Sequence, residues 1–114
     1  MAAPVRGEIW LIDFDPTRGH EQAGLRPALI VSDDRFNRGR SSLVFAIPLT
    51  ATERGLPTHV PVGPPEGGVR VPSYIKCEDL RSVSTERLVD GPWGKVLAPT
   101  ITAVEETLRW LMNL

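Results

Sequence analysis

The chain has 114 residues and a mass of 12.5 kDa, which is typical of a single domain (1–114) with a hydrophobic core that needs no metal or disulfide. Its 13 basic and 14 acidic residues give a net charge of −1, which argues against a protein that coats nucleic acid nonspecifically. No apolar run approaches the roughly 18 residues of a membrane span. With one cysteine, Cys77, and no secretory signal at the N-terminus, we expect a cytoplasmic protein.

Hydrophobic patterning predicts short strands along most of the chain. Segment 8–14 is apolar on both faces and rich in β-branched and aromatic residues, which predicts a central strand. Segment 33–41 has no periodicity and predicts a mobile loop, and 63–68 is so rich in Gly and Pro that it predicts a turn. Further strands are predicted at 27–32, at 43–49 with Pro48 marking a bulge or an edge, at 58–62, and in an alternating stretch from 69 to 83 with Val69, Val71 and Ile75 on one face.

The C-terminal segment changes to the period of an amphipathic helix. Apolar residues recur at helical spacing at Ile101, Val104, Leu108, Leu111 and Met112. Thr102 and Glu105 have the spacing of a capping box, and Pro99 suits a first helical turn. Five to seven short strands followed by one helix predict a mainly β fold, a small and partly open barrel.

Several kinds of chemistry have little support in the sequence. His20, His59 and Cys77 lack metal-ligand spacing, and no glycine-rich phosphate-binding motif is present, so we expect neither a metal nor a cofactor. A Cys–His nucleophilic pair stays open from spacing alone. However, Cys77 falls on the apolar phase of a predicted strand, which favours a buried, inert thiol. The alternation around His59 predicts a surface side chain.

The loop 17–27 is the strongest candidate for a functional segment. It joins two predicted strands, exceeds the usual hairpin length, and concentrates Arg, His, Glu and Gln. Eleven of the thirteen cations in the chain are arginine, whose planar fork suits phosphate or carboxylate. Loops of this composition are often plain structural turns, but long polar loops on rigid scaffolds are also where binding groups lie.

Motifs in this loop and beyond it follow one another in a distinctive order. They are R-G-E-I-W at 6–10, D-F-D-P-T at 13–17, G-H-E-Q-A-G-L-R-P-A-L-I-V-S at 19–32, I-P-L-T at 47–50, L-P-T-H-V at 56–60 and E-D-L-R-S-V at 78–83. Together with the terminal helix, they resemble the MazF/PemK family of bacterial toxins over nearly the full chain. Leu25 stands where some members have His, and Asp79 where Gln is frequent, so both positions bear on base preference.

The resemblance implies an SH3-like or CcdB-like barrel that is a sequence-specific, metal-independent endoribonuclease. Such toxins cleave single-stranded RNA, chiefly mRNA, and are neutralised by a cognate MazE-like antitoxin. The family's essential arginine falls on Arg26 and its essential threonine on Thr50, which would act on the scissile phosphate. Glu21 would accept the 2′-OH proton or hold Arg26, and Arg26 itself could transfer a proton. RNA contacts are expected at Arg18, His20, Gln22, Gly24 and Arg81.

Two other functions fit the same predicted fold. A CcdB-like toxin would inhibit DNA gyrase by binding and would not need the pair of Arg26 and Thr50. A non-enzymatic SH3-like module would bind acidic or Pro-rich peptides. In each case the small sheet and single helix should leave apolar surface exposed, with Trp110 off the main helical stripe. Together with the resemblance to the MazF/PemK family, this exposed surface predicts a two-fold homodimer with RNA running across both subunits.

Overall fold

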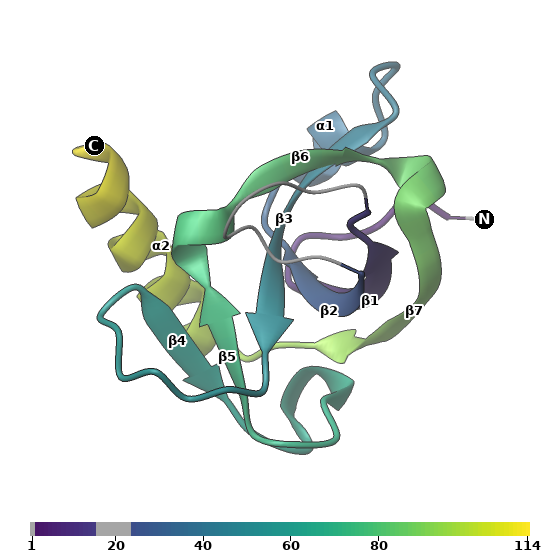
Figure 1. The fold of residues 1–114 in the computed structure, drawn as a ribbon. Helices are drawn as coiled ribbons and strands as arrows, with labels where there is room; N and C mark the ends of the chain where they lie inside the picture. The colour runs from purple at the N-terminus through teal and green to yellow at the C-terminus, as the bar shows by residue number, and fades with distance from the viewer. Residues whose placement is uncertain (1, 16–23) are drawn as a thin grey trace.

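The computed structural model describes residues 2–15 and 24–114, and in them an antiparallel sheet of seven strands is followed by a C-terminal helix (Figure 1). The strands run in the order β4-β5-β3-β2-β1-β7, and β6 pairs with β3. The sheet curves without closing, which confirms the predicted partly open barrel. The strands are β1 (Glu8–Asp13), β2 (Leu25–Ile30), β3 (Leu43–Thr50), β4 (His59–Val62), β5 (Ser73–Lys76), β6 (Arg81–Ser84) and β7 (Leu88–Lys95).

Strands β1, β2 and β3 form the middle of the sheet and are buried on both faces. One face of β1 places Ile9 in a cluster with Leu29 and Ile47, and the other places Ile12 in a second cluster with Ile30. All five of these side chains are inaccessible to solvent. The nearly continuous apolar character of segment 8–14 follows from this position, because β1 lies between β2 and β7.

Strand β3 exchanges partners along one edge. Its first residues pair with β6, up to Ala46 opposite Arg81, and its last pair with β5, from Leu49 opposite Ile75. Pro48 lies between these two ladders, while its pairing with Ala28 of β2 continues without a shift in register. The prediction of a bulge is wrong, whereas the prediction of an edge holds locally, because neither the β6 ladder nor the β5 ladder includes Pro48. The proline, which has no N–H to donate, occupies the point where β6 gives way to β5.

Three segments differ from the sequence predictions. Segment 33–41 contains the short helix α1 (Asp34–Asn37), whose N-cap Asp33 accepts a hydrogen bond from the Arg35 N–H at 2.8 Å. The stretch 69–83 is divided by the 3₁₀ turn η2 (Cys77–Asp79), and Val71 precedes β5 with 52% of its surface exposed. The sequence pattern does not predict strand β7, because Gly91, Pro92 and Gly94 lower the strand propensity of this segment.

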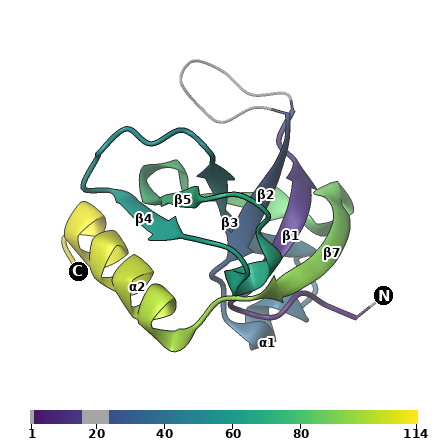
Figure 2. The ribbon, with the colours of Figure 1, turned by 90° about the horizontal axis from the view of Figure 1, so that it is seen from below.

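The C-terminal helix α2 (Ala98–Met112) runs alongside β4 (Figure 2). Val104 is buried in the core, and Ile101 and Leu108 pack against it. The predicted capping box is wrong, because Thr102 lies inside the helix. The first turn instead holds Pro99 and is capped by Glu66 of the 3₁₀ turn η1 (Glu66–Gly68), whose Oε2 accepts from the Leu97 N–H at 2.9 Å. In the described residues, no helix is long and apolar enough to cross a membrane.

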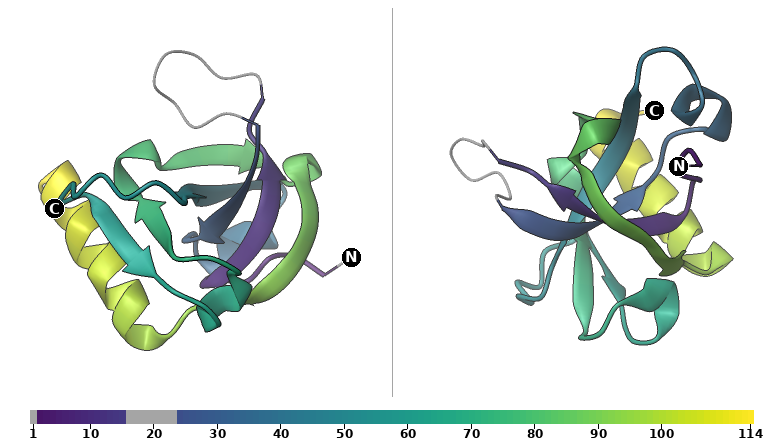
Figure 3. Two further views of the ribbon diagram at one scale, coloured as in Figure 1. Left: turned by 60° about the horizontal axis from the view of Figure 1, so that its bottom comes forward. Right: turned by 90° about the vertical axis from the view of Figure 1, so that its right-hand side faces the viewer.

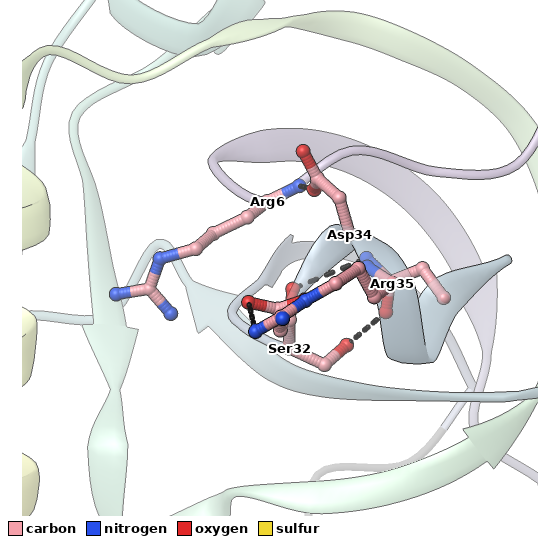
Figure 4. Close-up of polar contacts among 6 residues, drawn as sticks. Arg6, Ser32, Asp34 and Arg35 are labelled. Carbon is pink, nitrogen blue, oxygen red and sulfur yellow. Dashed lines mark hydrogen bonds and ion pairs between the residues drawn. The ribbon is translucent and has the colours of Figure 1, made fainter. Parts of the chain in front are cut away.

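A polar network ties the N-terminus to the end of β2 (Figure 4). The Asn37 side-chain amide donates to the carbonyls of Pro4 and Ser32, each at 3.1 Å, and its oxygen accepts from the Ser32 hydroxyl. The Arg6 N–H donates to Asp34 at 2.8 Å, and the Arg6 guanidinium forms an ion pair with Glu105 of α2 at 2.5 Å. Ser32 and Asn37 are buried, so this network has a structural role.

Candidate active site

Arg26 and Thr50 come together at one edge of the sheet. The antiparallel register pairs Ala28 with Pro48, and continuing it by two residues aligns Arg26 at the start of β2 with Thr50 at the end of β3. Because side chains alternate along a strand, both lie on the same face. Figures 2 and 3 show this edge, where β2 begins, β3 ends and the loop to β4 departs.

The two side chains line a single cavity of about 460 Å³, within the range typical of small-ligand sites. In the part of the chain that the structure describes, three of its lining side chains are cationic, namely Arg26, Arg54 and Lys76, and one, Glu78, is a carboxylate. The other lining residues are Thr50, Ala51, Thr52 and Leu56. An excess of positive charge in a polar hollow suits a phosphate group, and arginine can hold it with two parallel hydrogen bonds.

The Thr50 hydroxyl is oriented by its own chain. Its Oγ1 accepts a hydrogen bond from the Thr52 N–H at 3.2 Å. A hydroxyl that accepts at one lone pair still has its proton to donate. Thr50 therefore presents an O–H donor to the cavity beside the guanidinium of Arg26.

The wall formed by segment 51–57 is exposed at every position. A hydrogen bond of 3.0 Å from the Tyr74 hydroxyl to Glu53 attaches this wall to β5. The bond raises the pKa of Tyr74, with burial and the charge of Glu53 adding to the shift. Tyr74 pairs with Thr50 in the sheet, so the wall that carries Arg54 is fastened next to the threonine.

Glu78 is held by two neighbours from the start of β4. The Thr58 hydroxyl donates to its Oε1 at 2.8 Å, and His59 Nε2 lies 3.1 Å from its Oε2. Burial alone would raise the pKa of Glu78, but hydrogen bonds from Thr58, from its own backbone and from His59 outweigh burial and lower the pKa. The carboxylate therefore stays ionised at neutral pH.

The prediction of a surface position for His59 is wrong, since only 3% of its side chain is exposed. His59 does lie on the opposite face from the core residue Val60, as alternation requires. That outer face is covered by η2, which brings Glu78 over the imidazole.

Arg81 lies outside the cavity lining. Its guanidinium packs over the Phe14 ring at 4.5 Å and forms an ion pair of 3.0 Å with Asp79. Asp79 also lies 4.0 Å from Lys76. The carboxylate at position 79 is thus compensated by two cations, which reduces the repulsion that it would exert on a phosphate.

Four of the predicted site residues, Arg18, His20, Glu21 and Gln22, lie outside the described residues. Gly24 is described and closes the loop that contains them. Its N–H donates to Asp15 and its carbonyl accepts from Phe14, both at 3.0 Å. The φ of Gly24 is +75°, a conformation that favours glycine over other residues.

Cys77 is buried with 1% of its surface exposed, and burial together with the charge of Glu78 raises its pKa to about 12. This confirms the prediction of a buried thiol, which at such a pKa is a poor nucleophile. Within 2–15 and 24–114, no cluster of three His, Cys, Asp or Glu side chains could hold a metal ion.

Sequence reasoning missed three charged residues of the cavity: Arg54, Lys76 and Glu78. Lys76 had a usable signal, because β5 alternates and places Lys76 on the face opposite the buried Ile75. Glu78 begins the motif at 78–83, but the direction of its side chain into the cavity depends on the 3₁₀ turn η2, which follows β5. Arg54 lies in an irregular loop, and nothing in the local pattern assigns it to a site.

Comparison with known proteins gives a consistent result. A family model described as PemK-like, MazF-like toxin of type II toxin–antitoxin system matches residues 5–112. The endoribonuclease MazF9 of Mycobacterium tuberculosis is 35% identical over 114 residues, which cover 96% of each chain.

Solved structures agree with the family match. The crystal structure of MazF (Form-I) from Deinococcus radiodurans superposes with a TM-score of 0.88 at 27% identity, covering all of both chains. An endoribonuclease in complex with its cognate antitoxin from a mycobacterial species gives a TM-score of 0.77 at 27% identity, covering all of this chain and 97% of that one.

Proposed function

We propose that this chain, which belongs to the family of PemK-like, MazF-like toxins of type II toxin–antitoxin systems, is an endoribonuclease that cleaves single-stranded RNA. The observation that carries the proposal is the cationic cavity in which Arg26 and Thr50 stand side by side. In the proposed reaction the 2′-hydroxyl gives up its proton as its oxygen attacks the adjacent phosphorus, the bond to the 5′-oxygen breaks, and that oxygen takes up a proton, so that no proton is gained or lost overall. The products are a 2′,3′-cyclic phosphate and a 5′-hydroxyl.

Arg26 stabilises the charge that develops on the phosphate. Arg26 lies at the edge of the sheet, and its exposed side chain lines the cavity, where a ligand can contact it. A bidentate guanidinium is complementary to two oxygens of the pentacoordinate phosphorane, and pre-positioned charge of this kind is often the largest contribution to catalysis. Arg54 and Lys76 add to the positive potential without needing to touch the reacting atoms.

Thr50 orients the phosphate. Its proton is available because the Thr52 N–H already occupies one lone pair of Oγ1, so the hydroxyl donates to a non-bridging oxygen. Together with Arg26, it aligns the phosphorus with the attacking 2′-oxygen. We keep Glu21 as a further catalytic residue that accepts the 2′-OH proton or holds Arg26, and we keep Arg18, His20, Gln22, Gly24 and Arg81 as RNA contacts.

Incubation of the purified protein with a long single-stranded RNA in the presence of a chelator tests the proposal. We expect discrete cuts that persist in excess EDTA, and sequencing of the ends maps the recognised sequence. A preparation of Arg26→Ala purified in the same way controls for contaminating nucleases. Intact RNA would contradict the proposal, and intact RNA with inhibition of DNA gyrase would favour the CcdB-like alternative.

The cavity also favours an acidic peptide as inhibitor. A groove that holds phosphates accepts carboxylates from an extended segment, and a mycobacterial endoribonuclease has been solved with its cognate antitoxin. We propose a cytoplasmic toxin neutralised by a MazE-like antitoxin whose acidic tail covers Arg26. Loss of that tail should weaken inhibition strongly, and equal inhibition by the shortened antitoxin would contradict this part of the proposal.

Apolar side chains near the end of α2 support the proposal of a homodimer. Trp110 is 64% exposed and Leu114 is 85% exposed, and Leu111 and Met112 beside them are also exposed. Exposing this much large apolar side chain in water is unfavourable, and a second copy of the chain would cover it. Light scattering at micromolar concentration should give about twice the 12.5 kDa chain mass, and a monomeric mass would contradict the dimer.

A further inference from the structure

Among the described residues, Glu78 is the one carboxylate that lines the cavity beside three cations, and a phosphate would be repelled by it. Building on the proposed ribonuclease function, we propose that Glu78 reads a nucleobase. Its carboxylate accepts a hydrogen bond from the exocyclic amino group of a base next to the scissile phosphate. Arg26 and Thr50 would hold the phosphate while Glu78, in the same cavity, selects the base.

The carboxylate has both the orientation and the capacity for this role. Thr58 donates to Oε1 and His59 contacts Oε2, so neither oxygen can rotate freely. An ionised carboxylate has four acceptor positions, and the hydrogen bonds from Thr58, His59 and the backbone of Glu78 occupy three of them, which leaves one for a ligand. The side chain is 33% exposed, so a ligand in the cavity can reach it.

His59 acts as a fixed donor to this carboxylate. It is 97% buried by side-chain surface, and its Nδ1 is also buried, with no hydrogen-bond partner in the described part of the chain. A proton on Nδ1 would therefore be a buried donor without an acceptor, which is costly. The arrangement fits the neutral tautomer with its proton on Nε2, pointing at Oε2. His59 is thus a positioning residue, and Glu78 is the group that meets RNA.

The chemistry of the bases determines which of them fit. Cytosine, adenine and guanine carry an amino group on the Watson–Crick edge, which single-stranded RNA leaves open for recognition. Uracil carries the acceptor O4 where cytosine has its amino group, and O4 facing a carboxylate is repulsive. Acidic side chains accept from cytosine N4 in the same way in other nucleic-acid complexes. Because uracil still has its N3–H donor, the amino contact shows as a preference within matched pairs: cytosine over uracil, adenine over purine and guanine over inosine.

Glu78→Gln makes a sharp test because it preserves shape. In the variant His59 can still donate to the amide oxygen, and the Thr58 hydroxyl can turn and accept from the amide nitrogen. The amide then presents an N–H donor to the cavity where the carboxylate presented an acceptor. Preference for an amino-bearing base should disappear or reverse towards uracil.

The experiment uses RNAs built around a cleavage site mapped with the wild-type protein. Pairs of RNAs differ at one flanking position only, cytosine against uracil, adenine against purine, or guanine against inosine. At the flanking position whose base contacts Glu78, we expect the wild type to cut the amino-bearing RNA at least about tenfold faster than its partner RNA. In Glu78→Gln we expect the ratio at that position to fall below about threefold or to invert.

Glu86→Gln is the matched control, because it makes the same change of carboxylate to amide at an exposed residue that does not line the cavity. It should alter overall RNA affinity but keep the base ratio. If Glu78→Gln is too slow to assay, its affinities for the same RNAs, made uncleavable by one 2′-deoxyribose at the scissile position, give the ratio instead. An unchanged ratio in Glu78→Gln, or a ratio that Glu86→Gln loses to the same extent, overturns the inference. Failure of the wild type to cut any RNA would instead refute the proposed ribonuclease function.

Discussion

The two ends of strand β2 carry polar clusters of opposite character. Beyond its last residue, Ser32 and Asn37 are buried, and their side chains bond to each other and to the backbone. At its first residues, Arg26 shares an open cavity with Thr50, and among the described residues lining it the three cations outnumber the carboxylate of Glu78. Polar groups that are fully used by the chain stabilise the fold, whereas polar groups that face an open cavity are available to a ligand.

The largest effect on cleavage should come from substitutions in the cavity at the start of β2. Arg26→Ala and Thr50→Ala should each lower the cleavage rate at least about 100-fold, or roughly 3 kcal/mol of transition-state stabilisation, with melting temperatures near that of the wild type. Arg26→Lys should recover only part of the rate, because a point charge cannot reproduce the planar fork. Single-turnover rates measure this, and near-normal rates in either alanine variant would refute the site.

Substitutions in the buried cluster of Ser32 and Asn37 should lower stability and leave cleavage nearly unchanged. Asn37→Ala leaves the Ser32 hydroxyl and two buried carbonyls without their partner, which should destabilise the protein by about 2–3 kcal/mol. Cleavage per folded molecule should stay within about twofold of the wild type, since nothing near the cavity changes. Urea denaturation gives the stability, and loss of activity in fully folded Asn37→Ala would erase the distinction between the two clusters.

His59→Ala should have an intermediate effect. It removes one of the two side chains that hold Glu78 and empties a site that is nearly closed to solvent. We expect roughly a tenfold loss of discrimination between bases, with a smaller change in the rate on the preferred RNA. Thr58→Val, which removes the other donor, should act in the same direction. A neutral result in both variants would show that the orientation of Glu78 is unimportant.

The smallest effect concerns pH. Because the folded-state pKa of Glu78 is lowered, its contacts add stability above the ordinary pKa of 4.5 and lose it as the pH falls through the folded-state value. The stability of Glu78→Gln should therefore approach that of the wild type as the solution is acidified below this pKa. Urea titrations of both proteins at several pH values test this, and a constant difference would contradict the sign of the shift.

Local pattern was enough for the central strands and for the facing pair of Arg26 and Thr50. Both residues sit at strand ends that an antiparallel hairpin brings together, so their proximity follows from order and register. The burial of His59 could not be predicted from the sequence pattern. Alternation assigned it to the outer face, but only the 3₁₀ turn at 77–79, which is closed by tertiary contacts, covers that face with Glu78. The α2 cap was missed for the same reason, because Glu66 is remote in sequence from the helix.

The most direct test of the central claim is cleavage of an RNA with a single 2′-deoxyribose immediately before a mapped scissile bond. If the 2′-oxygen is the nucleophile that Arg26 and Thr50 align with the phosphate, the modified bond should stay intact while other sites in the same molecule are cut. The unmodified RNA should yield a fragment ending in a 2′,3′-cyclic phosphate. Cleavage at the deoxyribose with a normal rate would contradict the account, because the attacking group would then not come from the RNA.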